Sequence, residues 1–335
     1  MSLPNLYPIN PANKIDGDIP IELLVYCGCI QYWHYCLVVH NKHSTVYSES
    51  SVNIPYEGKP LESRTTCHWK IKVTTNHVTS AWSRPAQWSM AFMSDDDWKA
   101  QWIGLDKSFP EDILKEKTRL AARYFRKEFQ SSGEIVKSKL YISGLGLYEA
   151  YINGEKVGDQ VLAPTSTDYI KNVKYNTFDV TGLVTRGDNA IGVVLGSGRF
   201  FNMRTAEDKS YPPLPPTQNY GFPKMIFQLE VEYADGSRQL IVSDDSWKVT
   251  ADGPILANNE FDGEEYDARK EMQGWSSPGF DDVNWMEAEW TDAPGGTLQA
   301  QLNSNIKVME TLTPRTRCVY PRHGTEYRGM GGSEG

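Results

Sequence analysis

Residues 199–204 combine aromatic, amide and guanidinium side chains in one short stretch, Arg-Phe-Phe-Asn-Met-Arg. An aromatic ring offers a flat face on which the apolar face of a sugar can stack. Arg and Asn side chains supply the hydrogen bonds that sugar hydroxyl groups need. The candidate sugar-binding residues of this loop are Arg199, Phe200, Asn202 and Arg204. The same composition suits a loop that packs against an adjoining domain, and the sequence leaves both interpretations open.

A second group of reactive side chains lies near the N-terminus. Cys27, Cys29, His34 and Cys36 make the pattern C-x-C-x4-H-x-C. Thiolate and imidazole groups bind zinc, but this spacing is not one of the common zinc patterns. The chain has five cysteines in all, an odd number that does not suggest a disulfide framework. We therefore expect incidental thiols in a strand-rich segment.

Several function classes are disfavoured by what the sequence lacks. It has no glycine-rich phosphate loop, no Ser-His-Asp order and no H-E-x-x-H motif. The net charge of −9, without any basic block, argues against a nucleic-acid partner. No apolar run reaches membrane-spanning length. The first residues show no secretory signal, so the location stays open: periplasmic or extracellular if a leader has been removed, cytoplasmic otherwise.

The elements that must position these residues are short strands. Apolar side chains alternate with polar ones from Met225 to Tyr233, which is the period of a half-buried strand. Asn153-Gly154 and Asp235-Gly236 lie between such runs and predict tight hairpins. A short helix is expected only between Glu111 and Arg123. The pattern predicts an all-β protein with minor helix.

Composition shifts divide the chain into three units. Residues 1–95 end in a strand, S-x-W-S and a final strand, which resembles the end of a fibronectin type III domain. The acidic run after Met93 marks a boundary, and residues 98–290 form the second unit. Ala293-Pro294-Gly295-Gly296 is a linker. Residues 300–335 are expected to begin a further β-domain that is cut short.

Seven motifs in the second unit occur in an order that belongs to one family. They are W-K-A-Q-W-I-G at 98–104, Y-F-R-K-E-F at 124–129, Y-I-S-G-L-G-L-Y-E-A-Y-I-N-G-E-K-V-G at 141–158, N-A-I-G-V-V-L-G-S-G-R-F at 189–200, D-D-S-W-K at 244–248, G-E-E-Y-D-A-R at 263–269 and G-W-S-S-P-G-F-D-D-V-N-W at 274–285. Together they resemble the N-terminal β-domains of bacterial α-L-rhamnosidases of glycoside hydrolase family 78. The resemblance implies a fibronectin III-like domain followed by a jelly-roll β-sandwich.

The resemblance also implies a possible calcium site. In some members the sandwich binds rhamnose through calcium, which an Asp-Asn pair after the hairpin and a carbonyl of a proline-containing loop hold in place. The matching positions here are Asp159, Gln160 and Pro213, with Gln160 standing where the family has Asn. Such oxygen donors suit calcium and leave positions for sugar hydroxyls.

For function, the resemblance implies the accessory part of an enzyme that hydrolyses terminal α-L-rhamnosides with inversion. Inversion needs two carboxylates about 6.5–9.5 Å apart, and the family carries them on a helical barrel after the β-domains. This sequence holds no helical repeat, so we expect the chain alone to be inactive. Its expected partners are rhamnose-containing glycans and that catalytic barrel, with Glu264, Tyr266, Asp267 and Arg269 facing the latter.

A second interpretation stays open because two regions do not fit the family pattern. Tyr26–Tyr47 packs Cys, His, Trp and Tyr without alternation, and Arg315–His323 leads into a glycine-rich tail. The alternative is a stand-alone sugar-binding or interaction protein without activity, from a truncated or frame-disrupted gene. Simple divergence explains the same two regions equally well.

Overall fold

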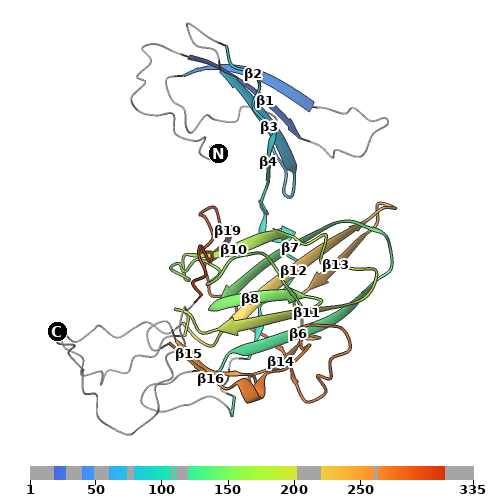
Figure 1. Ribbon diagram of the computed structural model, residues 1–335, viewed down its shortest axis with the longest axis vertical. Helices are drawn as coiled ribbons and strands as arrows, with labels where there is room; N and C mark the ends of the chain where they lie inside the picture. The colour runs from blue at the N-terminus through green and yellow to red at the C-terminus, as the bar shows by residue number, and fades with distance from the viewer. Residues whose placement is uncertain are drawn as a thin grey trace, which may run out of the picture.

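The structure is a computed structural model that describes residues 19–27, 40–48, 60–73, 79–105, 107, 109–110, 120–201, 220–259 and 263–313. Strands dominate these residues, together with two single-turn 3-10 helices, η1 (Asp95–Asp97) and η2 (Ala268–Lys270). The all-β fold that the alternating pattern predicts is confirmed. The described residues form an N-terminal sheet and a larger sandwich, joined by one segment of chain (Figure 1).

The N-terminal unit is a four-stranded antiparallel sheet. Its order is β2 (His40–Ser48), β1 (Ile19–Cys27), β3 (Thr66–Val73) and β4 (Ala86–Ser89). Cys67 and Trp69 of β3 are buried. Cys67 is disulfide-bonded, so at least this cysteine is not an incidental thiol. Cys29, His34 and Cys36 lie outside the described residues.

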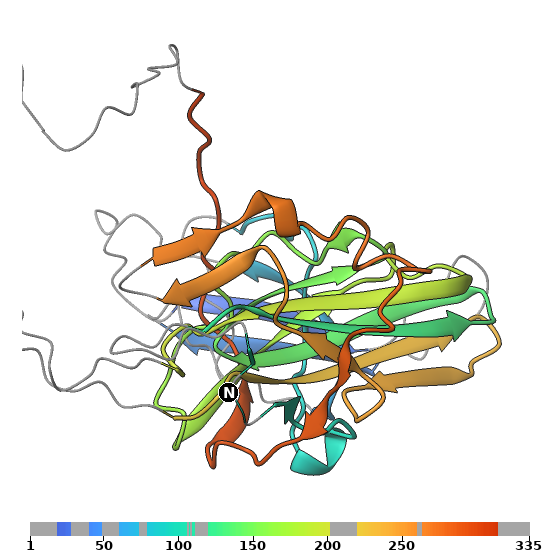
Figure 2. The ribbon, with the colours of Figure 1, turned by 90° about the horizontal axis from the view of Figure 1, so that it is seen from below.

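The sandwich consists of two sheets that face each other (Figure 2). One sheet has the order β18 (Glu289–Trp290), β5 (Ile103–Gly104), β12 (Lys224–Tyr233), β7 (Ile135–Leu145), β10 (Asn172–Asp179) and β19 (Thr297–Ala300), with β13 (Arg238–Val242) paired to β12. The other has the order β17 (Met286–Glu287), β14 (Lys248–Thr250), β6 (Arg123–Ser131), β11 (Gly187–Gly196), β8 (Leu147–Ile152) and β9 (Glu155–Lys156). A separate hairpin pairs β15 (Ile255–Asn259) with β16 (Gly263–Tyr266).

The core lies between the two sheets because one face of each strand is apolar. In β12, Met225 and every second residue to Val231 are fully buried, and Tyr233 is 6% exposed. Trp247 is also fully buried and donates its indole N–H to the Val242 carbonyl at 2.8 Å. The period-two pattern of β12 is confirmed.

Local turn chemistry follows the sequence closely. Asn153 and Gly154 both have positive φ, 54° and 85°, and connect β8 to β9. Gly236, with φ of 83°, closes the β12–β13 hairpin. Asx turns also form: Asp244 accepts from the Ser246 amide and Asp281 from the Val283 amide.

Two glycines allow close backbone approaches. Gly146 has φ of 134°, and a Cβ there would lie 2.1 Å from the Gly196 carbonyl oxygen. A Cβ on Gly192 of β11 would lie 2.6 Å from the ring of Trp275, so this ring lies directly against the strand. The loop that contains Trp275 therefore rests directly on the outer face of the second sheet.

Two expected boundaries differ in the structure. Arg123 begins β6 and Leu120 bridges to Asn258, so the end of the expected helix is extended chain, while residues 111–119 lie outside the described residues. Strand β19 pairs in parallel with β10, which places residue 300, expected to begin a further unit, in the sandwich together with residues 297–299. Lys307 bridges to Gln160, so the following segment also packs on this sandwich.

Candidate functional site

Asp159 and Gln160, the two residues expected to hold calcium, lie in different surroundings. Asp159 is exposed, and its carboxylate accepts from Lys307 Nζ at 2.7 Å. Gln160 is 2% exposed, and its amide donates to the Val157 carbonyl at 3.1 Å. The Gln160 Oε1 atom is buried beneath the hairpin, close to Gly158, without a hydrogen-bond partner.

These donors do not fit a calcium ion. Calcium takes several oxygens that converge on one point, but one carboxylate here is paired with an ammonium group and the amide oxygen is turned inward. Pro213 lies outside the described residues. Within the part of the chain that the structure describes, no three His, Cys, Asp or Glu side chains lie close enough together to hold a metal ion among themselves.

We therefore expect millimolar calcium to leave the thermal stability of the chain unchanged. A ligand that binds only the folded state raises the melting temperature as its concentration exceeds the dissociation constant. Thermal unfolding followed by circular dichroism, with calcium or with a chelator, measures this. A calcium-dependent rise of several degrees that Asp159→Ala removes would contradict the expectation.

The loop at 199–204 is described only in part. Phe200 is 1% exposed, and its ring stacks on Tyr220 at 5.8 Å and meets the edge of Tyr169 at 5.3 Å. Its ring face is therefore not available to a sugar, and Phe200 is a packing residue. Arg199 is exposed, while Asn202 and Arg204 lie outside the described residues.

The residues expected to face an adjoining domain lie on the β15–β16 hairpin and its end. Glu264, Tyr266 and Arg269 are exposed. Tyr266 donates its hydroxyl to Glu271 at 2.8 Å, and Arg269 pairs with Asp267 at 2.7 Å. The hydrogen bonds from Arg269 lower the pKa of Asp267 to about 2. The hairpin thus presents an ordered, charged surface to solvent.

A contact between the two units was not foreseen from the sequence. We call it the junction: Arg64 and Phe92 of the N-terminal side, with Asp97, Tyr141 and Glu230. Arg64 donates its Nε–H to both oxygens of Glu230, at 2.8 and 3.0 Å, and an Nη1–H to Asp97 at 2.7 Å. The same guanidinium lies 4.5 Å above the Phe92 ring, which stacks on Tyr141 at 4.1 Å.

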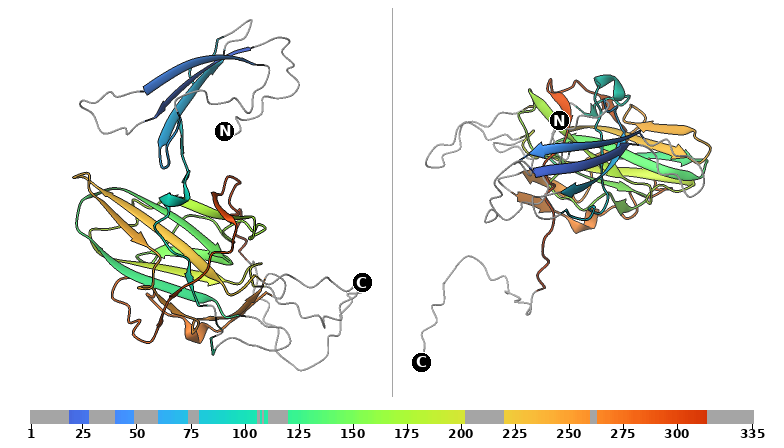
Figure 3. Two further views of the ribbon diagram at one scale, coloured as in Figure 1. Left: turned by 180° about the vertical axis from the view of Figure 1, so that it is seen from behind. Right: turned by 90° about the horizontal axis from the view of Figure 1, so that it is seen from above.

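Electrostatics at the junction favour the charged forms. Burial alone would raise the pKa of Asp97, but hydrogen bonds from Ser63 and Arg64 outweigh it and lower the pKa to about 2. The paired carboxylates in turn raise the pKa of Arg64 although its burial acts to lower it. Figure 3 shows the N-terminal sheet lying over the sandwich at this end.

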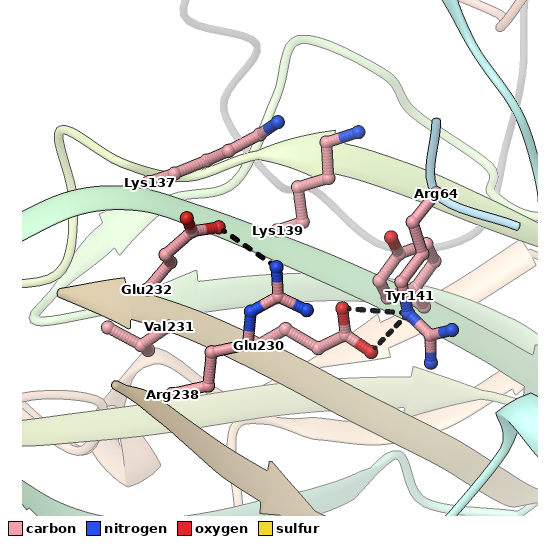
Figure 4. A pocket seen from close by; sticks show the side chains of 8 residues that line it. All are labelled: Arg64, Lys137, Lys139, Tyr141, Glu230, Val231, Glu232 and Arg238. Carbon is pink, nitrogen blue, oxygen red and sulfur yellow. Dashed lines mark hydrogen bonds and ion pairs between the residues drawn. The ribbon is translucent and has the colours of Figure 1, made fainter. Parts of the chain in front are cut away.

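Beside the junction lies a pocket of about 80 Å³, lined mainly by charged side chains (Figure 4). The polar lining residues are Lys137, Lys139 and Tyr141 of β7, Glu230 and Glu232 of β12, Arg238 of β13, and Arg64. Strand register sets Lys139 opposite Glu230 and Lys137 opposite Glu232. A Lys-x-Lys run and a Glu-x-Glu run at period two are visible in the sequence, but nothing there shows that they are neighbours.

Comparison with known families matches both units. Residues 133–310 match a family described as the α-L-rhamnosidase N-terminal domain. Residues 33–94 match a family described as the Rha78A-like, N-terminal immunoglobulin domain. The N-terminal unit is thus matched as immunoglobulin-like, an architecture that fibronectin type III domains share.

Individual relatives carry the same name and are much longer. The chain is 40% identical over 248 residues to an α-L-rhamnosidase of Formosa agariphila, covering 73% of this chain and 26% of the relative. It is 34% identical over 265 residues to an α-L-rhamnosidase of Alteromonas sp., covering 78% and 28%. Among solved structures, the α-L-rhamnosidase of Dictyoglumus thermophilum superposes with a TM-score of 0.73 at 36% identity, covering 88% and 32%. The chain therefore spans about a quarter to a third of each.

Proposed function

The chain belongs to the α-L-rhamnosidase N-terminal domain family, and from this premise we propose that it forms the accessory, non-catalytic portion of an enzyme that hydrolyses terminal α-L-rhamnosides. The observation that carries the proposal is the partial coverage of its relatives. Aligned relatives named α-L-rhamnosidase extend well beyond the matched residues, which make up 26–28% of their length. The proposed glycan partners are rhamnose-containing.

The chemistry of the described residues supports a non-catalytic role. Glycoside hydrolysis by inversion needs one carboxylic acid and one carboxylate free to act across the bond. In the pocket, Glu230 is paired with Arg64 and Glu232 with Arg238, at 2.8 and 3.6 Å. Both carboxylates are thus held by guanidinium groups rather than free to act across a glycosidic bond.

The β15–β16 hairpin is the proposed contact with the catalytic portion. Glu264, Tyr266 and Arg269 are exposed there; the first two lie in β16, and the Asp267 side chain caps η2 by accepting from the Arg269 amide. Exposed charged and aromatic groups on an ordered hairpin suit a polar interdomain interface. No helix among the described residues is long and apolar enough to cross a membrane.

We expect the purified chain not to hydrolyse aryl α-L-rhamnosides. The physical reason is that the two carboxylates of the pocket, Glu230 and Glu232, are engaged in ion pairs rather than free to act across a bond. Release of the chromogenic aryl group measures this, with the full-length Formosa agariphila relative at equal molarity as the positive control. Turnover that persists at constant specific activity through repeated purification would contradict the proposal.

The accessory role has its own test. In the Formosa agariphila relative, the aligned N-terminal portion is deleted in one variant and replaced by this chain in another. We expect the deletion to lose soluble, active enzyme and the replacement to restore it. A deletion variant as active as the whole enzyme would contradict an accessory role.

A further inference from the structure

We propose that the pocket beside the junction binds the anionic group of an acidic sugar unit, a carboxylate or a sulfate, through Lys137, Lys139 and the hydroxyl of Tyr141. The identity of the ligand as a sugar rests on the proposed function, in which the chain accompanies a glycoside hydrolase. The site itself rests on the charges, burial and unpaired donors of the pocket.

Positive charge in the pocket is not fully matched. The two carboxylates of β12 are taken: Glu230 by Arg64 and Glu232 by Arg238. Neither Lys137 nor Lys139 forms an ion pair with a carboxylate of the described residues, and the only hydrogen bond of Lys139 Nζ runs to the neutral hydroxyl of Ser89, at 3.0 Å. Two ammonium groups therefore remain for an anion from outside.

The two lysines are placed to share one anion. They are two residues apart on one face of β7, so their Cα atoms are separated by about 6.5–7 Å. Figure 4 shows both side chains extending to the same side, away from the carboxylates of Glu230 and Glu232. Burial, and then the neighbouring charge of Lys137, lower the pKa of Lys139, although Asp179 and Glu230 act to raise it. A bound anion would offset both effects.

Tyr141 supplies the second, independent observation. The residue is 1% exposed and lines the pocket, yet its hydroxyl has no hydrogen-bond partner. A buried hydroxyl without a partner costs stability, and proteins seldom retain one without a reason. An oxyanion held by the adjacent lysines would provide the missing acceptor.

The size of the pocket limits what enters it. About 80 Å³ is the room of several water molecules and suits a carboxylate or sulfate group. A whole sugar ring does not fit, so the ring would lie outside, over the mouth of the pocket. The ligand class is therefore a uronic acid or a sulfated sugar, and a neutral sugar lacks the group that the pocket selects.

The test is isothermal titration of the full chain with five probes: D-glucuronate, D-glucose 6-sulfate, D-glucose, L-rhamnose and inorganic sulfate. We expect at least one acidic sugar to bind, more weakly as salt rises because ions screen the charges, and neutral sugars not to bind at this site. The first two probes distinguish a carboxylate from a sulfate. Inorganic sulfate binding as tightly as both acidic sugars would overturn the assignment to a sugar.

Three variants localise the site. Lys137→Gln and Lys139→Gln each remove one charge-assisted hydrogen bond, and we expect each to weaken binding roughly tenfold. Tyr141→Phe should also weaken binding without lowering thermal stability. The matched control is Lys248→Gln, which removes the same charge from β14 of the other sheet, where Lys248 pairs with Glu287.

Absence of binding by either acidic sugar at millimolar concentration overturns the proposal, as does equal weakening by the control variant. Unchanged affinity in Tyr141→Phe would show that the bound anion accepts no hydrogen bond from the Tyr141 hydroxyl. That result would contradict the proposed site. These titrations measure direct binding of each probe to the chain. They are independent of hydrolysis and of the chimeric enzyme, so failure here and failure of the proposed function are distinguishable.

Discussion

Replacing Arg126 by methionine is expected to lower the free energy of unfolding of the sandwich by about 3 kcal/mol. The Arg126 side chain is 2% exposed and binds the loop that follows Gly274. It donates to the carbonyls of Trp275 and Ser277, at 2.8 and 2.9 Å, and forms ion pairs with Asp282 and Glu128. Methionine fills much of the volume but leaves the two carbonyls and the Asp282 carboxylate without their donor.

Urea unfolding followed by tryptophan fluorescence measures this loss, because Trp275 and Trp285 stack within the same loop. For a unit of this size the melting temperature should fall by roughly 6–12 °C. The matched control is Arg238→Met, whose side chain is 71% exposed, and a change within about 0.5 kcal/mol is expected there. A loss below about 1 kcal/mol in Arg126→Met would show that the loop is held by its aromatic contacts instead.

Replacing Arg64 by alanine is expected to release the N-terminal unit from the sandwich. The substitution removes one cation from two carboxylates that are 17% and 23% exposed, those of Asp97 and Glu230, and removes the group above the Phe92 ring. The N-terminal unit then has lost its ion pairs to both acidic groups. We expect protease cleavage within residues 90–98 to become roughly tenfold faster, since cleavage follows the population of the open form.

Acid should produce the same release in the unaltered chain. The pKa of Asp97 is about 2 in the folded protein, below its ordinary value of 3.8. A lowered carboxyl pKa contributes stability that is complete above the ordinary pKa and is lost as the pH falls through the folded value. The junction should therefore loosen between about pH 4 and pH 2, and the radius of gyration from small-angle scattering should rise in that window.

The control for both measurements is Arg84→Ala, because Arg84 is exposed on the N-terminal unit and takes no part in the junction. It should match the unaltered chain in cleavage rate and in its response to acid. In Arg64→Ala the acid-dependent change should be much smaller, because the junction is already open. Cleavage and scattering that are unchanged in Arg64→Ala would contradict a junction that depends on this residue.

Features set by neighbouring residues could be predicted from the sequence. Positive φ at Asn153 and Gly154, the Asx turns at Asp244 and Asp281, and the buried face of β12 all depend on short-range chemistry. Alternation over nine residues is enough to assign a buried face, since a shift by one residue would expose every apolar side chain.

Features set by distant residues could not be predicted. The bond from Arg64 to Glu230 joins positions 166 residues apart, and the pairing of Lys307 with Asp159 joins positions 148 apart. The pocket depends on the register between β7 and β12, which no local pattern contains. For Phe200 the sequence leaves a sugar site and domain packing both open, because residue type does not distinguish an exposed ring from one enclosed by Tyr169 and Tyr220.

The parallel pairing of β10 with β19 has a practical consequence for anyone who shortens this chain. The backbone of β10 at residues 172–175 is covered by residues 297–300. A fragment that stops at Trp290, where the sequence suggests that the sandwich ends, would leave those amide and carbonyl groups unpaired at the edge of a sheet. Unpaired edge strands pair with strands of other molecules, so such a fragment is expected to aggregate. A fragment that retains residues through 313 keeps β19 paired with β10.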